Sequence, residues 1–345
     1  MSLHSEIHEQ PAILAGLLAG QRETVERIAK RTQERDLRYV FLAARGTSDN
    51  AGRYANYLWG ARNHLPVALA TPSLFTYYEQ PPRLRDALVV GISQSGQSPD
   101  IVSVLAEGQR QGCLTLAFTN EPDSPLAQVS DFIVDLQAGR ELAVAATKTY
   151  TSELLAIAML SMALSSEQGG WDELARVPGW VEAVLRADEA ITGLVQRYRY
   201  MNQCVVLGRG YNYSTAFEWA LKLKELTYVE AEPYSSADFK HGPIAMVERG
   251  FPVMAVVPRG KVFQPMLTML EELRNDYLAE LVVISNADEA LELAQSPIPL
   301  PRELPEWLSP LASIVAGQLF AYHLTAAKGF DTEKPRNIRK VTETH

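Results

Sequence analysis

The sequence predicts an α/β fold made of two tandem domains of one kind, each a parallel sheet flanked by helices. Short apolar runs, typical of buried strands, alternate with helical stretches along most of the 345 residues. The order strand, glycine turn, helix, strand, helix, strand occurs twice, at 38–120 and 203–286. The copies are about 165 residues apart, and a period of this length is too long for a solenoid.

Each element follows from its local pattern. Residues 5–36 form a charged amphipathic pattern that predicts a helix. In the first copy we expect strands at 38–44, 87–92, 114–119 and 132–136, and helices at 50–62, 99–111 and 147–165. A helical link at 178–198 precedes the second copy, with strands at 203–207, 252–257 and 281–285 and helices at 214–228, 263–275 and 310–328. The expected domains are an N-terminal helical segment (1–36), a first domain (37–175), a second domain (176–330) and a C-terminal tail (331–345).

Composition excludes several classes of protein. The chain has 32 basic and 41 acidic residues, a net charge of −9, which argues against nucleic acid as a partner. Its two cysteines, Cys113 and Cys204, lie in apolar stretches and suit a reducing compartment. No apolar run is long enough to span a membrane, and the N-terminus does not resemble a signal peptide. We expect a soluble cytoplasmic protein with no membrane partner.

The strongest local motif is the serine-rich turn at 93–98, between a buried strand and a helix. Ser98 suits the N-cap and Pro99 the first helical position. The helix amides and the hydroxyls of Ser93, Ser95 and Ser98 predict an anion site, although an ordinary polar loop explains the pattern about equally well. The turn at Thr47 and Ser48 follows the first strand in the same way. Both turns lie where open α/β sheets bind ligands.

A second constellation occupies the helix after Gly210. Glu218, Lys222 and Glu225 are spaced four and three residues apart and therefore share one face. A solvated ion-pair stripe is the simpler interpretation, whereas a reactive carboxylate is plausible at the ligand edge of a sheet. His241, between a lysine and Gly-Pro, is a candidate general acid or base. The basic tail at 334–340 is either a frayed terminus or a segment that folds over an anionic substrate.

Other cofactor motifs do not match. The turn at 208–210 lacks the third glycine of a dinucleotide fingerprint, and there is no P-loop or nucleophile elbow. His4 and His8 are one helical turn apart, but no third metal ligand is evident in the sequence. We therefore expect no metal site and a mobile N-terminus there.

Together these segments resemble the sugar isomerase (SIS) superfamily, and within it the isomerase half of glucosamine-6-phosphate synthase. The motifs that carry this resemblance occur in order along nearly the whole chain: EIHEQP at 6–11, GTS at 46–48, SQSG at 93–96, ELAVAATK at 141–148, ALKLKE at 220–225, KHGP at 240–243, QLFAYH at 318–323 and KPRNIRK at 334–340. The resemblance implies two SIS domains, each a flavodoxin-like three-layer sandwich.

The resemblance also implies roles for individual residues. The sugar-phosphate cradle would comprise Thr47, Ser48, Ser93, Gln94, Ser95 and Ser98, and Val144 lies on a segment that contacts the sugar. Glu225 would move a proton between C1 and C2 of the open-chain sugar, beside Lys222. His241 would open the ring from the adjacent subunit of a homodimer with a shared active site. Lys340, on the C-terminal tail over the active site, would contact the open-chain sugar. Either Lys340 or Lys222 would form any imine with the sugar carbonyl.

The activity implied is isomerisation of an amino-sugar phosphate, without metal or redox cofactor. The sequence begins with Met1-Ser2 at the isomerase part rather than at a glutamine-hydrolysing domain, so we expect no use of glutamine. Isomerising deamination of glucosamine 6-phosphate to fructose 6-phosphate and ammonia is the first interpretation. The alternatives are an aldose–ketose phosphosugar isomerase, a sugar-phosphate deglycase, and a non-catalytic SIS module that binds a sugar phosphate. Arg45 and Gln97 differ from the residues usual in the synthase, as does the tail after Lys340.

Overall fold

The computed structural model describes residues 2–165, 167 and 169–340, and it confirms the α/β class. The chain forms two compact units. We call one the N-terminal unit: it contains Ala12–Glu141, Lys148–Ala175 and, near the C-terminus, Arg339 and Lys340. The other, the C-terminal unit, contains the residues up to Pro11, Leu142–Thr147 and Arg176–Ile338. The chain therefore passes between the units several times.

The sheet of the N-terminal unit is entirely parallel, in the order β2-β1-β3-β4-β5. This is the doubly wound, flavodoxin-like strand order. Its strands are β1 (Tyr39–Ala43), β2 (Val67–Leu69), β3 (Ala87–Ile92), β4 (Leu114–Thr119) and β5 (Phe132–Asp135). The helices are α2 (Gly46–Asn63), α3 (Ser73–Thr76), α4 (Pro99–Arg110), α5 (Pro125–Gln128) and α6 (Lys148–Leu164), together with α1 (Leu3–Gln33), whose first turns up to Pro11 belong to the other unit.

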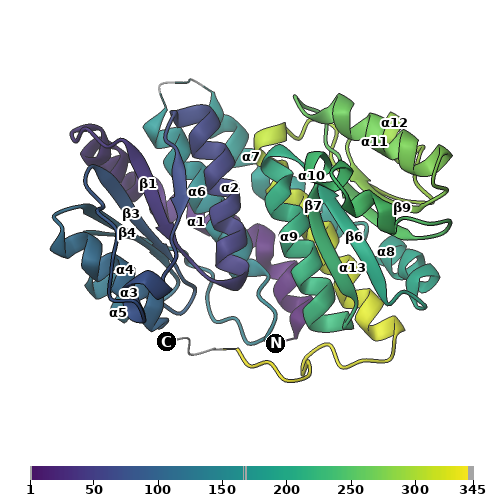
Figure 1. The fold of residues 1–345 in the computed structure, drawn as a ribbon, viewed down its shortest axis with the longest axis horizontal. Coiled ribbons are helices and arrows are strands. Elements are labelled where there is room, and N and C mark those ends of the chain that lie inside the picture. The colour runs from purple at the N-terminus through teal and green to yellow at the C-terminus, as the bar shows by residue number, and fades with distance from the viewer. Residues whose placement is uncertain (1, 166, 168, 341–345) are drawn as a thin grey trace. The chain divides into compact units, whose positions relative to one another are not determined.

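Helices cover both faces of this sheet (Figure 1). On one face α2 and α6 pack together, and Trp59 Nε1 of α2 donates to the carbonyl of Ile157 in α6 at 3.2 Å. On the other face α4 buries Ile101, Val104 and Leu105 against apolar strand residues. Burial on both faces explains why β3 is a continuous apolar run and why β4 is apolar except for Thr115 and Thr119.

The C-terminal unit repeats the same architecture. Its sheet is parallel in the order β10-β9-β8-β6-β7, which is the strand order of the first sheet in its own numbering. Its strands are β6 (Gln203–Gly208), β7 (Glu230–Ser235), β8 (Pro252–Val256), β9 (Glu280–Ser285) and β10 (Ser296–Pro299). The helices from residue 170 onward are α7 (Gly170–Leu185), α8 (Asp188–Leu194), α9 (Tyr213–Lys222), α10 (Ser236–Lys240), α11 (Phe263–Asn275), α12 (Asp288–Leu291) and α13 (Ser309–Ala327). Two domains of one kind are thereby confirmed.

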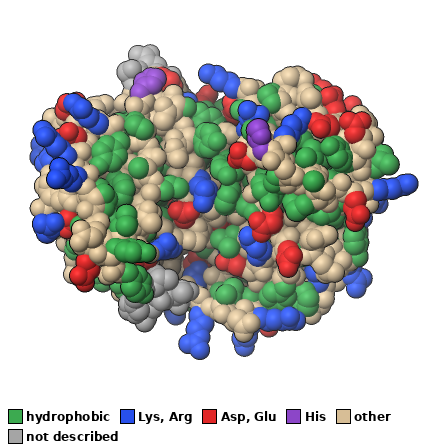
Figure 2. All heavy atoms as spheres, in the orientation of Figure 1, with side chains coloured by type: hydrophobic (Ala, Val, Ile, Leu, Met, Phe, Trp, Pro, Cys, Tyr) green, Lys and Arg blue, Asp and Glu red, His purple; other side chains and the backbone are tan. Residues whose placement is uncertain are grey.

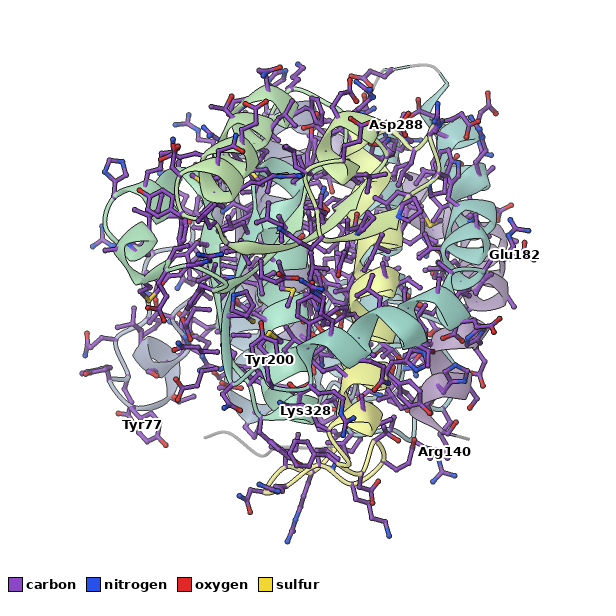
Figure 3. All side chains as sticks on the ribbon, turned by 90° about the vertical axis from the view of Figure 1, so that its right-hand side faces the viewer. Tyr77, Arg140, Glu182, Tyr200, Asp288 and Lys328 are labelled. Carbon is purple, nitrogen blue, oxygen red and sulfur yellow. The ribbon has the colours of Figure 1, made fainter. Side chains whose placement is uncertain are left out.

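The long helix α13 is apolar almost all round and is buried beside α9. Trp219 of α9 packs against Phe320 of α13, and a Cβ at Gly317 would lie only 3.0 Å from the Trp219 ring. Just beyond the end of α13, Lys328 Nζ donates to the carbonyls of Arg199 and Met201, next to Tyr200 (Figure 3). The lysine thus satisfies carbonyls in the segment that leads into β6.

Three strands were missed by the sequence analysis, and all three are edge strands: β2, β7 and β10. β2 has only three residues, β7 contains Pro233, and β10 contains Pro297 and Pro299. An edge strand needs hydrogen bonds on one side only, so it tolerates proline and polar residues that weaken the sequence signal.

The expected mobile N-terminus is wrong. Helix α1 begins at Leu3, and Glu6 and Gln10 in its first turns are fully buried. Gln10 Nε2 donates to Gln318 Oε1 of α13 at 2.9 Å. In the tail, Arg336 lies over the ring of Tyr228 at 4.4 Å. Residues 341–345 of the expected tail (331–345) lie outside the described residues.

Within the described residues, every helix is too short or too polar to cross a bilayer. On the face drawn in Figure 2, several basic side chains lie close together at the left edge, and basic and acidic side chains are interspersed over the rest.

Candidate active site

In the N-terminal unit, the turns after β1 and β3 lie side by side. These strands are parallel neighbours, with Ala43 opposite Gly91, so their carboxyl ends meet at one edge of the sheet. Helix α2 begins directly after β1 and α4 shortly after β3. The strand order reverses between β1 and β3, and ligands of doubly wound sheets bind at this switch point. Two helix N-termini here favour an anion.

The serine turn is shaped by its own hydroxyls. Ser93 Oγ accepts from the amide of Gly96 at 3.1 Å, and Ser95 Oγ accepts from the amide of Gln97 at 3.3 Å. A hydroxyl that accepts an amide still has its hydrogen to donate to an anion. Ser98 occupies the N-cap of α4 as expected, yet its side chain makes no capping hydrogen bond. Serine side chains at these positions therefore stabilise the turn and still have hydroxyl hydrogens that can bind a phosphate.

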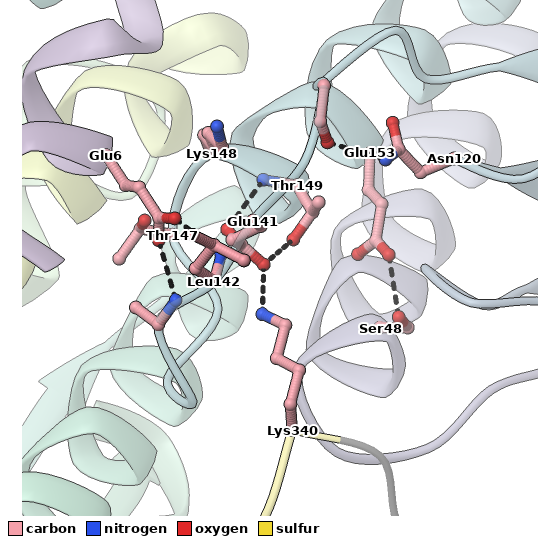
Figure 4. A network of polar contacts seen from close by, with 12 residues as sticks. Glu6, Ser48, Asn120, Glu141, Leu142, Thr147, Lys148, Thr149, Glu153 and Lys340 are labelled. Carbon is pink, nitrogen blue, oxygen red and sulfur yellow. Dashed lines mark hydrogen bonds and ion pairs between the residues drawn. The ribbon is translucent and has the colours of Figure 1, made fainter. Parts of the chain in front are cut away.

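Ser48 behaves differently from the other candidate phosphate ligands. It is buried in the first turn of α2, where its hydroxyl donates to Glu153 Oε1 of α6 at 2.7 Å (Figure 4). Thr47, beside it, is half-buried. The Ser48 hydroxyl hydrogen thus points to a carboxylate of its own unit. The sequence analysis did not single out Glu153, because a glutamate in an apolar helix gives no motif of its own.

Arg45 connects the two turns. It is the N-cap residue of α2, and its Nε donates to Asp100 Oδ2 in the first turn of α4 at 2.7 Å. Asp100 is only 1% exposed, whereas about half of the Arg45 side chain is exposed. Arg45 is one of the residues that differ from the synthase pattern, and it places a cation at the proposed phosphate site.

Gly96 allows the serine turn to form, and its replacement is a first test of the site. Its φ is +60°, and a Cβ there would lie 2.0 Å from Ser124 Oγ. We expect Gly96→Ala to destabilise the protein more than Gly112→Ala, where φ is +77° but no atom lies within 4 Å of the added Cβ. Denaturant unfolding of both variants measures the difference. An equal decrease in the free energy of unfolding of both variants would mean that the contact with Ser124 does not prevent a side chain at position 96.

Lys340 is also part of the N-terminal unit. Its Nζ lies 2.5 Å from Oε2 of Glu141, which is fully buried. The same Glu141 oxygen accepts from Thr149 Oγ1 at 2.8 Å, and Oε1 accepts from the Thr149 amide at 3.3 Å (Figure 4). Glu141 thereby anchors the last described residue of the chain. The sequence analysis quoted Glu141 within a motif but assigned it no role.

In the C-terminal unit, the expected shared face of α9 is confirmed. Lys222 Nζ lies 2.5 Å from Glu225 Oε2 and 3.4 Å from Glu218 Oε1. Lys222 and Glu218 are fully buried, while Glu225 is one-quarter exposed. Burial alone would lower the pKa of Lys222, but the two carboxylates outweigh it and hold that pKa above its usual value. Lys222 is therefore a charged lysine between two glutamates, and only Glu225 of the three faces solvent.

Glu225 does not lie in regular α-helix, as the expected helix at 214–228 implied. α9 ends at Lys222, and Leu223–Thr227 form a π-helical turn (η3). Thr227 Oγ1 donates to the Leu223 carbonyl at 2.6 Å, and Tyr228 ends the turn with a φ of +58°. π-turns inside helices occur frequently at functional sites. No residue in the sequence signals this change of helix type.

Val144 and His241 lie on two further segments of the C-terminal unit. The carboxylate of buried Glu6 accepts from the amides of Leu142 at 2.5 Å and Ala143 at 3.1 Å, and so fixes the segment that carries half-buried Val144 (Figure 4). His241 follows α10 and is exposed. Lys240 before it pairs with Glu272 at 2.5 Å.

The candidate residues thus form two groups. Serine turns, Arg45 and Lys340 belong to the N-terminal unit, and Lys222, Glu225, His241 and Val144 to the C-terminal unit. That the groups form one pocket stays a prediction. The arrangement defines a class of protein: tandem flavodoxin-like domains with a serine-rich turn at the sheet edge of one and a carboxylate–lysine pair in the other.

Comparison with known proteins identifies this class. The SIS domain family model matches residues 35–163 and 198–328. The chain belongs to the SIS domain family. It is 32% identical to a crystal structure described as a putative phosphosugar isomerase from Silicibacter pomeroyi, with a TM-score of 0.87 and coverage of 96% of this chain and 100% of that one.

Two further relatives bear on its activity. The C-terminal domain of a glucosamine-fructose-6-phosphate aminotransferase from Francisella tularensis is 27% identical, with a TM-score of 0.87 and 96% of both chains covered. Glutamine–fructose-6-phosphate aminotransferase (isomerizing) of Thermococcus kodakarensis is 34% identical over 344 residues, which are 97% of this chain and 56% of that protein. The chain thus spans little more than half the length of this curated relative.

Proposed function

We propose that this protein is a phosphosugar isomerase that acts on an amino-sugar phosphate, converting glucosamine 6-phosphate to fructose 6-phosphate and ammonia. The observation that carries the proposal is the partly exposed Glu225 carboxylate beside the buried cation of Lys222, on a helix of an SIS domain. The names of the relatives support the substrate class, because all three name a phosphosugar and one of them also names glucosamine.

The phosphate would bind at the switch point of the N-terminal unit. Ser93, Gln94, Ser95 and Ser98, with Thr47 opposite, supply hydroxyls, an amide side chain and helix amides there. Ser48 lies in the same turn as Thr47, but its hydroxyl donates to Glu153 and would have to turn away to reach a phosphate. Arg45 adds charge at the same edge. Binding energy from this end orients carbons that react several bonds away.

Chemistry would occur at C1 and C2 of the open-chain sugar, next to Val144. His241, from the neighbouring subunit of a homodimer, assists ring opening. Glu225 removes the proton from C2, which gives an enolamine, and returns a proton to C1. The C2 imine so formed adds water and releases ammonia, leaving the ketose. A positioned base of this kind contributes about 10²–10⁴-fold to the rate.

The two lysines have different roles in this proposal. An imine on an enzyme lysine requires a neutral amine, and the raised pKa of Lys222 keeps that amine protonated. Lys222 therefore positions Glu225 and offsets negative charge in the transition state. Lys340 is the better of the two for contact with the sugar carbonyl.

The activity is tested by incubating the purified full chain with glucosamine 6-phosphate and measuring ammonia and fructose 6-phosphate. The proposal expects the two products in equal amounts. Conversion of an unaminated aldose phosphate to its ketose without ammonia would instead support the alternative, an aldose–ketose isomerase, which the Silicibacter pomeroyi relative favours. Binding without turnover of either substrate would support a non-catalytic SIS module.

The phosphate site is tested by the double variant Ser95→Ala/Ser98→Ala. Because a hydrogen bond to a charged group is worth about 1.5–3 kcal/mol, we expect KM for the phosphosugar to rise at least about tenfold. The unphosphorylated amino sugar is the control, since its slow turnover should not change. An equal loss for both sugars would place the serines outside the phosphate site.

A further inference from the structure

Three histidines and one aspartate converge in the C-terminal unit, and none of them is assigned to the reaction. His4 and His8 come from the first turns of α1, Asp188 from the start of α8, and His323 from α13. His4 Nε2 and His8 Nε2 lie 2.7 and 2.8 Å from Asp188 Oδ2, and His323 Nε2 contacts Asp188 Oδ1. The sequence analysis found the histidine pair but not its partners, which are about 180 residues or more away.

The geometry of the cluster suits a metal ion. All three imidazoles approach with Nε2, a nitrogen that binds metals, and His4 and His8 at positions i and i+4 share one helix face. Ligand atoms of His4, Asp188 and His323 all lie within 4.8 Å of one another. A tetrahedral ion with bonds of about 2.0–2.1 Å requires ligand atoms about 3.3 Å apart. His8 Nε2 is 2.8 Å from Asp188 Oδ2 but is not part of that group, so its side chain would have to rotate to supply a fourth ligand.

The surroundings also resemble those of a metal site. The His323 side chain is 13% exposed and that of Asp188 20%, whereas His4 and His8 are 37% and 38% exposed, so the cluster is shielded on one side and open to solvent on the other. Thr192 Oγ1 lies 3.2 Å from both ring nitrogens of His323 and donates to the Asp188 carbonyl at 3.0 Å, so it adds a polar contact beside the cluster without distinguishing the two nitrogens.

We propose that His4, His8, Asp188 and His323 bind one divalent transition-metal ion, Zn²⁺ in particular. Three imidazoles and one carboxylate are ligands that suit zinc, and four protein ligands make a closed, structural site. The ion joins the beginning of α1 to α8 and α13, three elements that are far apart in the sequence. It takes no part in the proposed reaction, because Glu225, Lys222 and His241 lie on other segments.

The test is metal binding by the full chain, carried without a histidine tag and first stripped with a chelator. Zn²⁺ titrated against a chromophoric competitor should bind at about one ion per chain, and Co²⁺ should give visible absorption typical of tetrahedral coordination. We expect His323→Ala to weaken Zn²⁺ binding by more than about tenfold. His64→Gln is the matched control, because His64 is exposed and outside the cluster.

A second variant separates metal loss from misfolding. His8→Asn removes one imidazole from an exposed position of the cluster, so the chain should fold while its affinity for Zn²⁺ falls. Added Zn²⁺ should raise the thermal unfolding midpoint of the stripped wild-type chain and of His64→Gln, but not that of His323→Ala. Binding of equal strength in His323→Ala and wild type, or no binding by wild type, would overturn the proposal and leave a hydrogen-bonded histidine–aspartate cluster.

Discussion

Replacing Glu225 by glutamine is expected to lower kcat for ammonia release by about 10²–10⁴-fold, since the amide cannot take a proton from C2. The chain should remain folded, because a glutamine oxygen still accepts from Lys222 and Glu218 still lies 3.4 Å from that lysine. KM should change little, because other residues form the proposed phosphate site. Steady-state kinetics with circular dichroism of the same sample measures both outcomes.

A matched control for this variant is Glu232→Gln in β7, where the carboxylate is 57% exposed and 3.9 Å from Lys224. It removes the same charge from the same unit and should leave kcat unchanged. If Glu225→Gln no longer exchanges the C2 hydrogen of the substrate with solvent, the step that fails is removal of the C2 proton. Turnover at the wild-type rate would remove Glu225 as the base, although an SIS domain could still use another carboxylate.

Replacing Lys222 by methionine should reduce the free energy of unfolding by about 3–5 kcal/mol, the usual cost of leaving a buried charge without its partner. Glu218 would remain fully buried without its cation. Lys224→Met is the control two residues away: Lys224 is 42% exposed, and its weak surface ion pair contributes about 0–1 kcal/mol. Urea unfolding of both variants at neutral pH gives the comparison.

The pH dependence of this difference has a definite sign. The folded-state pKa of Lys222 is raised above its unfolded value of about 10.4. The stabilisation is therefore fully present below that unfolded value and is lost as pH rises through the folded-state pKa. The gap between wild type and Lys222→Met should be constant from neutral pH to about pH 10 and shrink only in stronger alkali. A gap that shrinks already near pH 8 would show that Lys222 is not held in its charged form.

Much of the fold could be predicted from the sequence because central strands and amphipathic helices have strong periodic signals. β3 and β4 are buried on both faces, so most of their residues are apolar and the strands can be recognised from the sequence. The edge strands β7 and β10 could not be predicted in this way. They pair with another strand on one side only, so they tolerate prolines and polar residues that break the apolar pattern of a strand.

The site was predictable only in part, for a similar reason. Lys222 and Glu225 are three residues apart, so helical spacing alone brings them together. Glu141 with Lys340, and Ser48 with Glu153, are long-range pairs that no local pattern specifies. The N-terminal histidines show the same limit, since their partners Asp188 and His323 become neighbours only when α8 and α13 are packed.

The passage of the chain between the units has a practical consequence for anyone who divides it. A fragment that begins near residue 176 would contain the second sheet and yet lack Glu6, Gln10 and the short segment Leu142–Thr147, which belong to the same compact body. Its Gln318 would lose a buried amide partner, and a strip of apolar surface under the first helical turns would meet water. Because each unit is made of three separate segments, no single truncation yields a complete unit. A fragment that contains one whole unit would have to join these segments through new linkers.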